Sequence, residues 1–370
     1  MLALVLSLTV LASFIWSRLA TSVALAGWSA LADAHWTERA RVAWPVVVDR
    51  VFLVVGLPAI ACLLATMAGV DAGAQLGLAA AAALGALVGT RDATRQIFPS
   101  VTLSRSLRAR SVHALASLPL GLALAAAALT PPSPLIATIV TSVLLFLSLA
   151  WTRALLPTLA RLGLAEPPPA RLQALLRRFS SQAELAVIAS PSPNAWAFPL
   201  TNQVLVSDTL LAALDDDELA AILAHELGHL AEPRWAKRAR ATLGLFHLPL
   251  PLLPLCAALD QLWLGVALIA LPLVLATALA QHLERLADRW AAARIAPADL
   301  ARALEKVHAL SYTPAVMTGS ATHPSLWSRM HEAGVAPSWP RPAPPRRGIG
   351  RLSVMVALTL VITLLASLHP

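Results

Sequence analysis

The sequence predicts a mainly α-helical, polytopic membrane protein with about eight spans and one polar domain of mixed helices and strands. Of its 370 residues, 58% are hydrophobic and only 13% are charged, and the mean hydropathy is +0.70. Soluble domains carry a larger share of charged residues. The apolar residues also gather in runs near 20 residues, about the length with which a helix crosses a hydrocarbon core of about 30 Å.

Eight apolar stretches are long enough to be spans, at 2–27, 46–69, 72–90, 112–130, 135–156, 243–259, 262–281 and 352–368. The loops between them alternate in charge. Loop 91–111 contains five arginines, whereas the turn at 131–134 contains no basic residue. Basic loops stay on the cytoplasmic side of a membrane. We therefore expect an integral protein of a bacterial inner membrane, with both long polar segments in the cytoplasm.

This pattern divides the chain into five regions. We expect a five-span N-terminal membrane region at 1–156 and a C-terminal span at 348–370. Between them we expect a polar catalytic domain in two parts, 157–242 and 282–347, separated by a transmembrane hairpin at 243–281. The two polar parts together have the size of one modest domain. The hairpin thus splits one domain in sequence.

The net charge of +8 does not indicate nucleic-acid binding. The chain has only two lysines, and its arginines lie beside apolar runs, as cytoplasmic loops require. Its two cysteines, Cys62 and Cys256, both lie inside apolar runs. A disulfide framework and a Cys-based zinc site are therefore excluded. Any metal ion must be bound by histidines and carboxylates.

Segment 214–233 predicts a well-capped helix in the first polar part. Asp215 and Glu218 have the spacing of a capping box, and apolar residues then recur with helical period. Pro233 predicts the end of the helix.

On this helix, His225 and His229 are four residues apart and project from one face, with Glu226 beside them. This is the HExxH motif, in which the two imidazoles bind one zinc ion and the Glu acts as general base. The alternative is a polar stripe on an amphipathic helix. The motif predicts one Zn²⁺ per chain, and a hydrolytic site needs a third protein ligand.

The third ligand has two candidates in the second polar part. Glu284 and Asp288 are also four residues apart, so both lie on one helix face. One of them could bind zinc while the other accepts a hydrogen bond from a ligand histidine. The alternative is a surface helix on which these acids form ordinary ion pairs with Arg285 and Arg289.

Four segments between about 185 and 330 occur in a specific order: Asn194-Ala195-Trp196-Ala197-Phe198, the His225–His229 motif, Glu284-Arg285-Leu286-Ala287-Asp288, and Thr322-His323-Pro324 with Arg329. In this order they resemble the integral-membrane zinc metalloendopeptidases that include HtpX and the type I CAAX prenyl proteases. The resemblance implies a zincin-like catalytic domain of the gluzincin type, split by a membrane hairpin.

The resemblance also implies roles for individual residues. Glu284 would be the third zinc ligand, and Asp288 would orient a ligand histidine. Residues 194–197 would lie on the strand that receives an extended substrate, although Trp196 replaces the usual Phe. His323 would lie near the reacting carbonyl, where it stabilises the oxyanion; the alternative is a capping or packed histidine in a turn.

These observations predict a membrane-embedded zinc endopeptidase. A zinc-activated water would attack the peptide bond, with Glu226 as general base. Protein or peptide substrates associated with the lipid bilayer are expected, in membrane-protein quality control or precursor processing.

Two alternatives come from other functional classes. A sensor or transducer peptidase of the antirepressor type would need an extracytoplasmic ligand-binding domain, which we do not expect after the eighth span. A non-enzymatic transporter would need paired ionisable residues inside the spans. The few candidates, Arg18, Asp49 and Arg50, lie near span ends.

Overall fold

The protein is described from a computed structural model, which covers residues 2–67, 70–99, 101–179, 181–317, 323–345, 348–350, 352–354 and 356–357. Its internal contacts divide the chain into two compact units. The first unit comprises Met1–Val101, Tyr312–Val316 and Arg341–Pro370, and the second comprises Thr102–Ser311 and Met317–Pro340. Most of the expected span at 352–368 lies outside the described residues.

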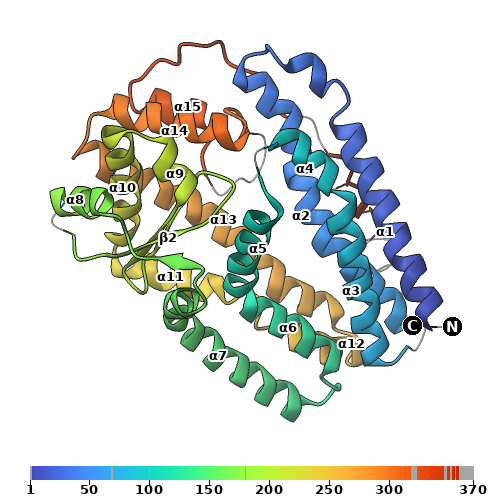
Figure 1. Ribbon diagram of the computed structural model, residues 1–370. Coiled ribbons are helices and arrows are strands. Elements are labelled where there is room, and N and C mark those ends of the chain that lie inside the picture. The colour runs from blue at the N-terminus through green and yellow to red at the C-terminus, as the bar shows by residue number, and fades with distance from the viewer. Residues whose placement is uncertain are drawn as a thin grey trace. The chain divides into compact units, whose positions relative to one another are not determined.

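The first unit is helical. Its elements are α1 (Leu2–Ala24), the 3₁₀ helix η1 (Trp28–Leu31), α2 (Trp36–Met67), α3 (Ala72–Gly89) and α4 (Arg91–Ile97) (Figure 1). Glycines bring α1 and α3 close together, because a Cβ added at Gly85 would lie 2.8 Å from Ser13 Cβ. Small residues at helix contacts allow such close backbone packing in lipid.

The second unit combines helices with a small sheet. Its helices before the sheet are α5 (Leu103–Ala116), α6 (Leu118–Leu129) and α7 (Pro134–Arg161). The sheet region contains β1 (Ala165–Glu166), α8 (Ala170–Arg178), β2 (Glu184–Ile188), β3 (Ala195–Phe198), β4 (Gln203–Ser207) and α9 (Asp208–Ala213). The remaining elements are α10 (Asp216–Leu230), α11 (Arg234–Gly244), the 3₁₀ helix η2 (Leu250–Leu252), α12 (Leu253–Ala258), α13 (Leu262–Ala292), α14 (Pro297–Ser311) and α15 (Leu326–Glu332) (Figure 1).

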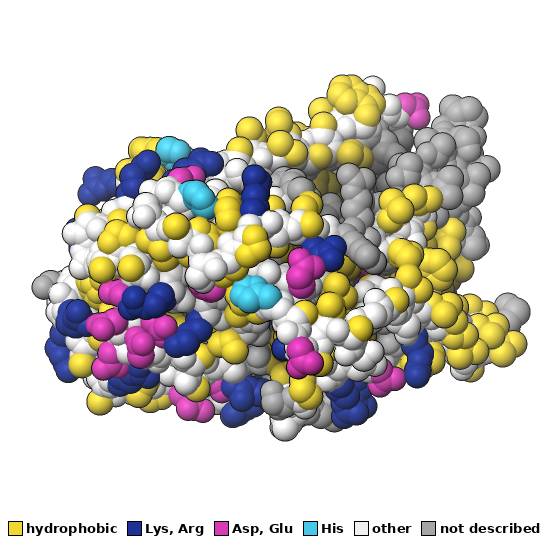
Figure 2. Space-filling view, turned by 90° about the horizontal axis from the view of Figure 1, so that it is seen from above, with side chains coloured by type: hydrophobic (Ala, Val, Ile, Leu, Met, Phe, Trp, Pro, Cys, Tyr) yellow, Lys and Arg dark blue, Asp and Glu magenta, His cyan; other side chains and the backbone are white. Residues whose placement is uncertain are grey.

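Four helices among the described residues are long and apolar enough to cross a membrane: Ala3–Ala24, Gly73–Ile97, Pro134–Arg161 and Trp263–Ala292. The pair α5 and α6 bends by 63° and forms a fifth candidate only if both helices make one span. These helices expose large apolar side chains, among them Phe146 and Trp263. Hydrophobic side chains, drawn in yellow, also lie at the surface on the face of the molecule that Figure 2 shows. Apolar surfaces of this kind are stable against the hydrocarbon core of a membrane. The protein is a helical membrane protein, and the total of eight spans stays a prediction.

The segment expected as a span at 243–259 does not form one helix. Helix α11 ends at Gly244, and η2 and the short α12 follow it. Pro249, Pro251 and Pro254 interrupt this stretch. Proline has no amide hydrogen to donate and its ring displaces the preceding turn, so closely spaced prolines break a helix that hydropathy alone would favour.

The sheet has the strand order β1-β2-β4-β3. Strands β2 and β4 are parallel, while the outer strands pair antiparallel to them. Every residue of β4 is buried, and one core cluster joins Leu205 of β4 and Ile188 of β2 to Leu159 of α7. The sheet also packs against α10, which lies next to β3. It therefore supports the helix that carries the HExxH motif.

Candidate metal centre and active site

Helix α10 begins at the predicted capping box. The Asp215 carboxylate accepts hydrogen bonds from the backbone N–H groups of Asp217 and Glu218, and the Glu218 side chain accepts one from Asp215 N. Glu218 also binds the Lys306 ammonium of α14, with the shorter contact at 2.7 Å. Residues 218–230 are all buried. The helix is thus held at its start and enclosed along the turns that carry the motif.

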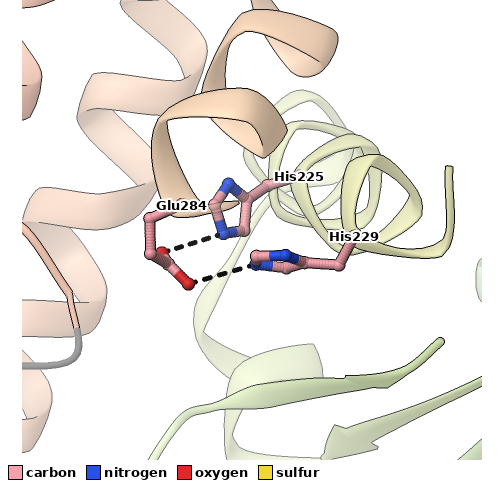
Figure 3. A group of neighbouring side chains, drawn as sticks. All are labelled: His225, His229 and Glu284. Atoms are coloured by element: carbon pink, nitrogen blue, oxygen red, sulfur yellow. Dashed lines mark ion pairs between the residues drawn. The ribbon is translucent and has the colours of Figure 1, made fainter. Parts of the chain in front are cut away.

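Three side chains of the motif and of α13 converge in the interior. His225 and His229 project from α10, and Glu284 reaches them from α13 (Figure 3). His225 Nε2 lies 3.5 Å from Glu284 Oε2, and His229 Nε2 lies 3.1 Å from Glu284 Oε1. All three residues are buried. Two imidazole nitrogens and one carboxylate therefore face a common point.

The donor set fits a metal ion. The ligand atoms of the three residues lie within 4.8 Å of one another. Ligands at about 2.0–2.1 Å from a tetrahedral zinc ion are about 3.3 Å apart, close to the spacings of Glu284 to the two imidazoles. Glu284 Oε2 is buried, and two imidazole nitrogens face it, His323 Nδ1 at 2.8 Å and His225 Nε2 at 3.5 Å. Imidazole nitrogens and carboxylate oxygens are the donor atoms that zinc takes in proteins.

A carboxylate and an arginine lie behind His225. Its Nδ1 is 2.9 Å from Asp288 Oδ1, on the side of the ring away from Glu284. Arg329 of α15 donates to both Asp288 oxygens, at 2.8 and 2.5 Å, and is itself buried. Burial alone would lower the pKa of His225, but contacts with the Asp288 and Glu284 carboxylates raise this pKa to about 9. The carboxylates thus favour positive charge at this point.

Arg329 and Glu232 are site residues to which the sequence analysis assigned no role. Arg329 belongs to the last of the four ordered segments, and its contact with Asp288 joins residues 41 positions apart. Glu232 contacts His229 from the turn after α10. In the sequence, its signal is a carboxylate three residues after the second histidine.

Glu226 lies between the two histidines on α10 and is buried. Within the part of the chain that the structure describes, its carboxylate makes no hydrogen bond and no ion pair. A carboxylate without such partners is available to accept a proton.

His323 is brought to the same carboxylate as the two histidines. Its Nδ1 lies 2.8 Å from Glu284 Oε2, and 65% of its side chain is exposed to solvent. The structure therefore places this residue at the rim of the metal site. It is the exposed member of the cluster, beside the buried His225, His229 and Glu284.

The segment expected to receive substrate is an edge strand. Asn194 directly precedes β3, which contains Ala195, Trp196 and Ala197. Among the described strands, β3 pairs only with β4. The strand therefore leaves one backbone edge unpaired within the described sheet, and an added strand could pair there.

Gly228 allows α10 and α13 to approach closely at the site. A Cβ added at Gly228 would lie 2.8 Å from Ala287 Cα and 2.9 Å from the Ala287 carbonyl oxygen. These are backbone atoms, so no side-chain rotation can make room for the added Cβ. The contact lies one residue from His229 and three residues from Glu284.

Gly228→Ala is therefore expected to lower the thermal midpoint and to weaken metal binding, because the two helices must separate. Overpacking of this kind costs about 1–3 kcal/mol. The matched control is Gly244→Ala in α11, where an added Cβ meets no atom within 4 Å. Thermal unfolding and metal content measure both effects. Unchanged values in Gly228→Ala would show that the close approach does not matter for the site.

Three comparisons relate this chain to known proteins, and the match to a family model agrees with this geometry. Residues 170–334 match the family model described as "Peptidase family M48". A search of the curated proteins finds no match. Among solved structures, the crystal structure of S. mikatae Ste24p is similar to this chain at a TM-score of 0.49 and 16% identity, over 89% of this chain and 98% of that one.

The family model spans the capping box, the HExxH helix, α13, α14 and the whole of α15. It therefore covers every residue of the candidate metal centre. Residues 170–334 of this membrane protein are thus similar to peptidase family M48, in agreement with the resemblance to HtpX and the type I CAAX prenyl proteases that the sequence motifs predicted.

Proposed function

We propose that this protein is a membrane-embedded zinc endopeptidase of the gluzincin type, acting in membrane-protein quality control or precursor processing. The observation that carries the proposal is the buried group of His225, His229 and Glu284, in which the Glu284 oxygens lie 3.5 and 3.1 Å from the two Nε2 atoms, close to the spacing of zinc ligands. Two imidazoles and one carboxylate leave a fourth position for water, as in hydrolytic zinc sites.

The chain's own residues account for the remaining chemistry. Zinc, when bound, lowers the pKa of a water molecule and polarises a peptide carbonyl. Glu226 accepts the proton of the attacking water and passes it to the leaving amine. His323, at the exposed rim, donates a hydrogen bond to the carbonyl oxygen as negative charge develops there. Asp288, held by Arg329, orients His225.

The substrates are expected to be proteins or peptides that bind in extended form. Asn194, Ala195, Trp196 and Ala197 would pair with the substrate backbone along the outer edge of β3. Backbone pairing depends on an extended shape more than on sequence. Trp196, which is 36% exposed, would contact a substrate side chain. Unfolded or membrane-associated segments are the polypeptides that offer such strands.

Metal analysis tests this function directly. The purified protein is expected to hold about one zinc ion per chain, and His225→Ala or His229→Ala should lose most of it, because two protein ligands bind zinc weakly. His331→Ala is the control, since this exposed histidine of α15 contacts the Trp327 carbonyl and not the metal group. Full zinc content in both ligand variants would refute the assignment, as would a wild-type protein that binds no zinc.

The active site is proposed to lie on the cytoplasmic side of a bacterial inner membrane, because the basic loops alternate along the sequence. Reporter fusions after residues 100 and 345 are expected to give cytoplasmic signals, and fusions after 132 and 370 the opposite. Reporter activity in cells measures each position. An extracytoplasmic signal from within 157–242 would contradict this location.

A further inference from the structure

Glu232 is a buried carboxylate outside the predicted ligand set. It lies in the turn between α10 and α11, and its side chain is completely buried. Its backbone N–H donates to the His229 carbonyl oxygen, which fixes the turn beside the histidine. Carboxylates are rarely enclosed unless specific partners hold them. Two partners hold this carboxylate, His229 and Arg240.

The first partner is His229. Its Nδ1 donates to Glu232 Oε1 at 2.9 Å, while its Nε2 lies 3.1 Å from Glu284 Oε1. A neutral imidazole carries one proton, and the hydrogen bond that one nitrogen makes determines which nitrogen keeps its lone pair. With the proton on Nδ1, the lone pair of Nε2 points toward the metal group.

The second partner is Arg240 of α11. Its Nη2 donates to Glu232 Oε1 at 2.5 Å and its Nε donates to Oε2 at 3.3 Å. The guanidinium thus contacts both oxygens, neutralises the buried charge and leaves one orientation for the carboxylate. Oε1 of Glu232 therefore accepts from both the imidazole and the guanidinium, while Oε2 accepts from the guanidinium alone.

The two histidines are therefore supported in the same way from different elements. Behind His225 lie Asp288 and Arg329, from α13 and α15, and behind His229 lie Glu232 and Arg240, from the turn and α11. Carboxylates behind metal-ligating histidines fix the ring orientation and increase the basicity of the ligand nitrogen.

We infer that Glu232, oriented by Arg240, is a positioning residue that directs His229 Nε2 to the metal. This inference rests on the proposed zinc site. It differs from a purely structural role of the Glu232–Arg240 pair, which would stabilise the turn between α10 and α11 without influencing the metal ligands.

The test compares zinc affinity and the visible absorption of the Co²⁺-substituted full-length protein in wild type and variants. Co²⁺ bands report the geometry and the strength of the ligands, so a pair that merely stabilised the turn would leave them unchanged. Glu232→Gln is expected to weaken zinc binding by about 10–100-fold and to shift the Co²⁺ bands, since an amide can present its NH₂ group to Nδ1 and favour the wrong tautomer.

Substitutions of Arg240, the more exposed residue of the Glu232–Arg240 pair, test the same contact. Arg240→Gln is expected to shift the Co²⁺ bands in the same direction, and Arg240→Lys, which keeps the positive charge, should restore most of the zinc affinity. The double variant Glu232→Gln/Arg240→Gln should be no weaker in zinc binding than Glu232→Gln alone, because both act through His229. If Glu232→Gln fails to fold, the two Arg240 variants decide the question.

The control is Asp216→Asn, which removes an exposed carboxylate of α10 that is paired with Arg171 at 2.5 Å. It should leave zinc affinity and the Co²⁺ bands unchanged. Wild-type affinity and wild-type bands in Glu232→Gln and Arg240→Gln would overturn the inference while the zinc site stands. A wild-type protein that binds neither Zn²⁺ nor Co²⁺ would instead overturn the proposed function.

Discussion

Glu226→Gln is expected to keep its zinc while proteolysis falls by about 10²–10⁴-fold, the usual contribution of a general base. The glutamine has the size of the glutamate, and Glu226 makes no ion pair or hydrogen bond to the described residues, so the three ligands should stay in place. The amide cannot accept the proton of the attacking water. Metal content and activity should therefore separate in this variant.

The measurement is zinc per chain beside the cleavage rate of a casein-like unfolded protein. Glu166→Gln, the same change at an exposed residue of β1, serves as the control and should cleave at the wild-type rate. If Glu226→Gln itself cleaved at the wild-type rate, the hydrolytic mechanism would fail, and the HExxH motif would be at most a structural metal site.

Glu284→Gln is expected to lose zinc affinity and proteolysis together. The Glu284 carboxylate faces both Nε2 atoms and also lies 2.8 Å from His323 Nδ1, and it is the only negatively charged member of the proposed ligand group. An amide oxygen is a much weaker ligand for zinc than a carboxylate. The loss of affinity should appear as a lower zinc content after dialysis against a chelator.

Asp288→Asn is the matched comparison on the same helix face. Asp288 contacts Nδ1 of His225 and the Arg329 guanidinium, not the point on which the ligand atoms converge. Its replacement should reduce zinc affinity or activity by a milder factor of about 10–100. Full zinc and wild-type activity in Glu284→Gln would mean that another residue is the third ligand, with Asp288 or His323 as the next candidates.

The membrane class and the HExxH helix could be predicted from sequence because both depend on local patterns. Span candidates follow from the length of apolar runs, and hydropathy is a property of each run by itself. The one-sided arrangement of His225 and His229 follows from the helical period, and the capping box follows from Asp215 and Glu218. No distant contact is needed for any of these features.

Hydropathy predicted a continuous helix where prolines prevent the backbone from forming one. The stretch 243–259 is as apolar as a span, yet its prolines divide it into η2 and α12. The prolines were visible in the sequence, but a sum of hydropathies does not count a missing N–H donor. The same limit applies to any span assigned only from its composition.

The sequence by itself determined a helical membrane protein with two imidazoles on one helix face, and its spacing left Glu284 and Asp288 equivalent. The family resemblance predicted that Glu284 binds the metal and that Asp288 orients a histidine. The tertiary structure supplies the physical reason for a difference between them, because the crossing of α10 and α13 at Gly228 and Ala287 turns Glu284 toward both Nε2 atoms and Asp288 toward Nδ1. It also decided which groups support the imidazoles. Arg329, Glu232 and Arg240 act through contacts across turns and between helices, and helical periodicity carries no information about such contacts.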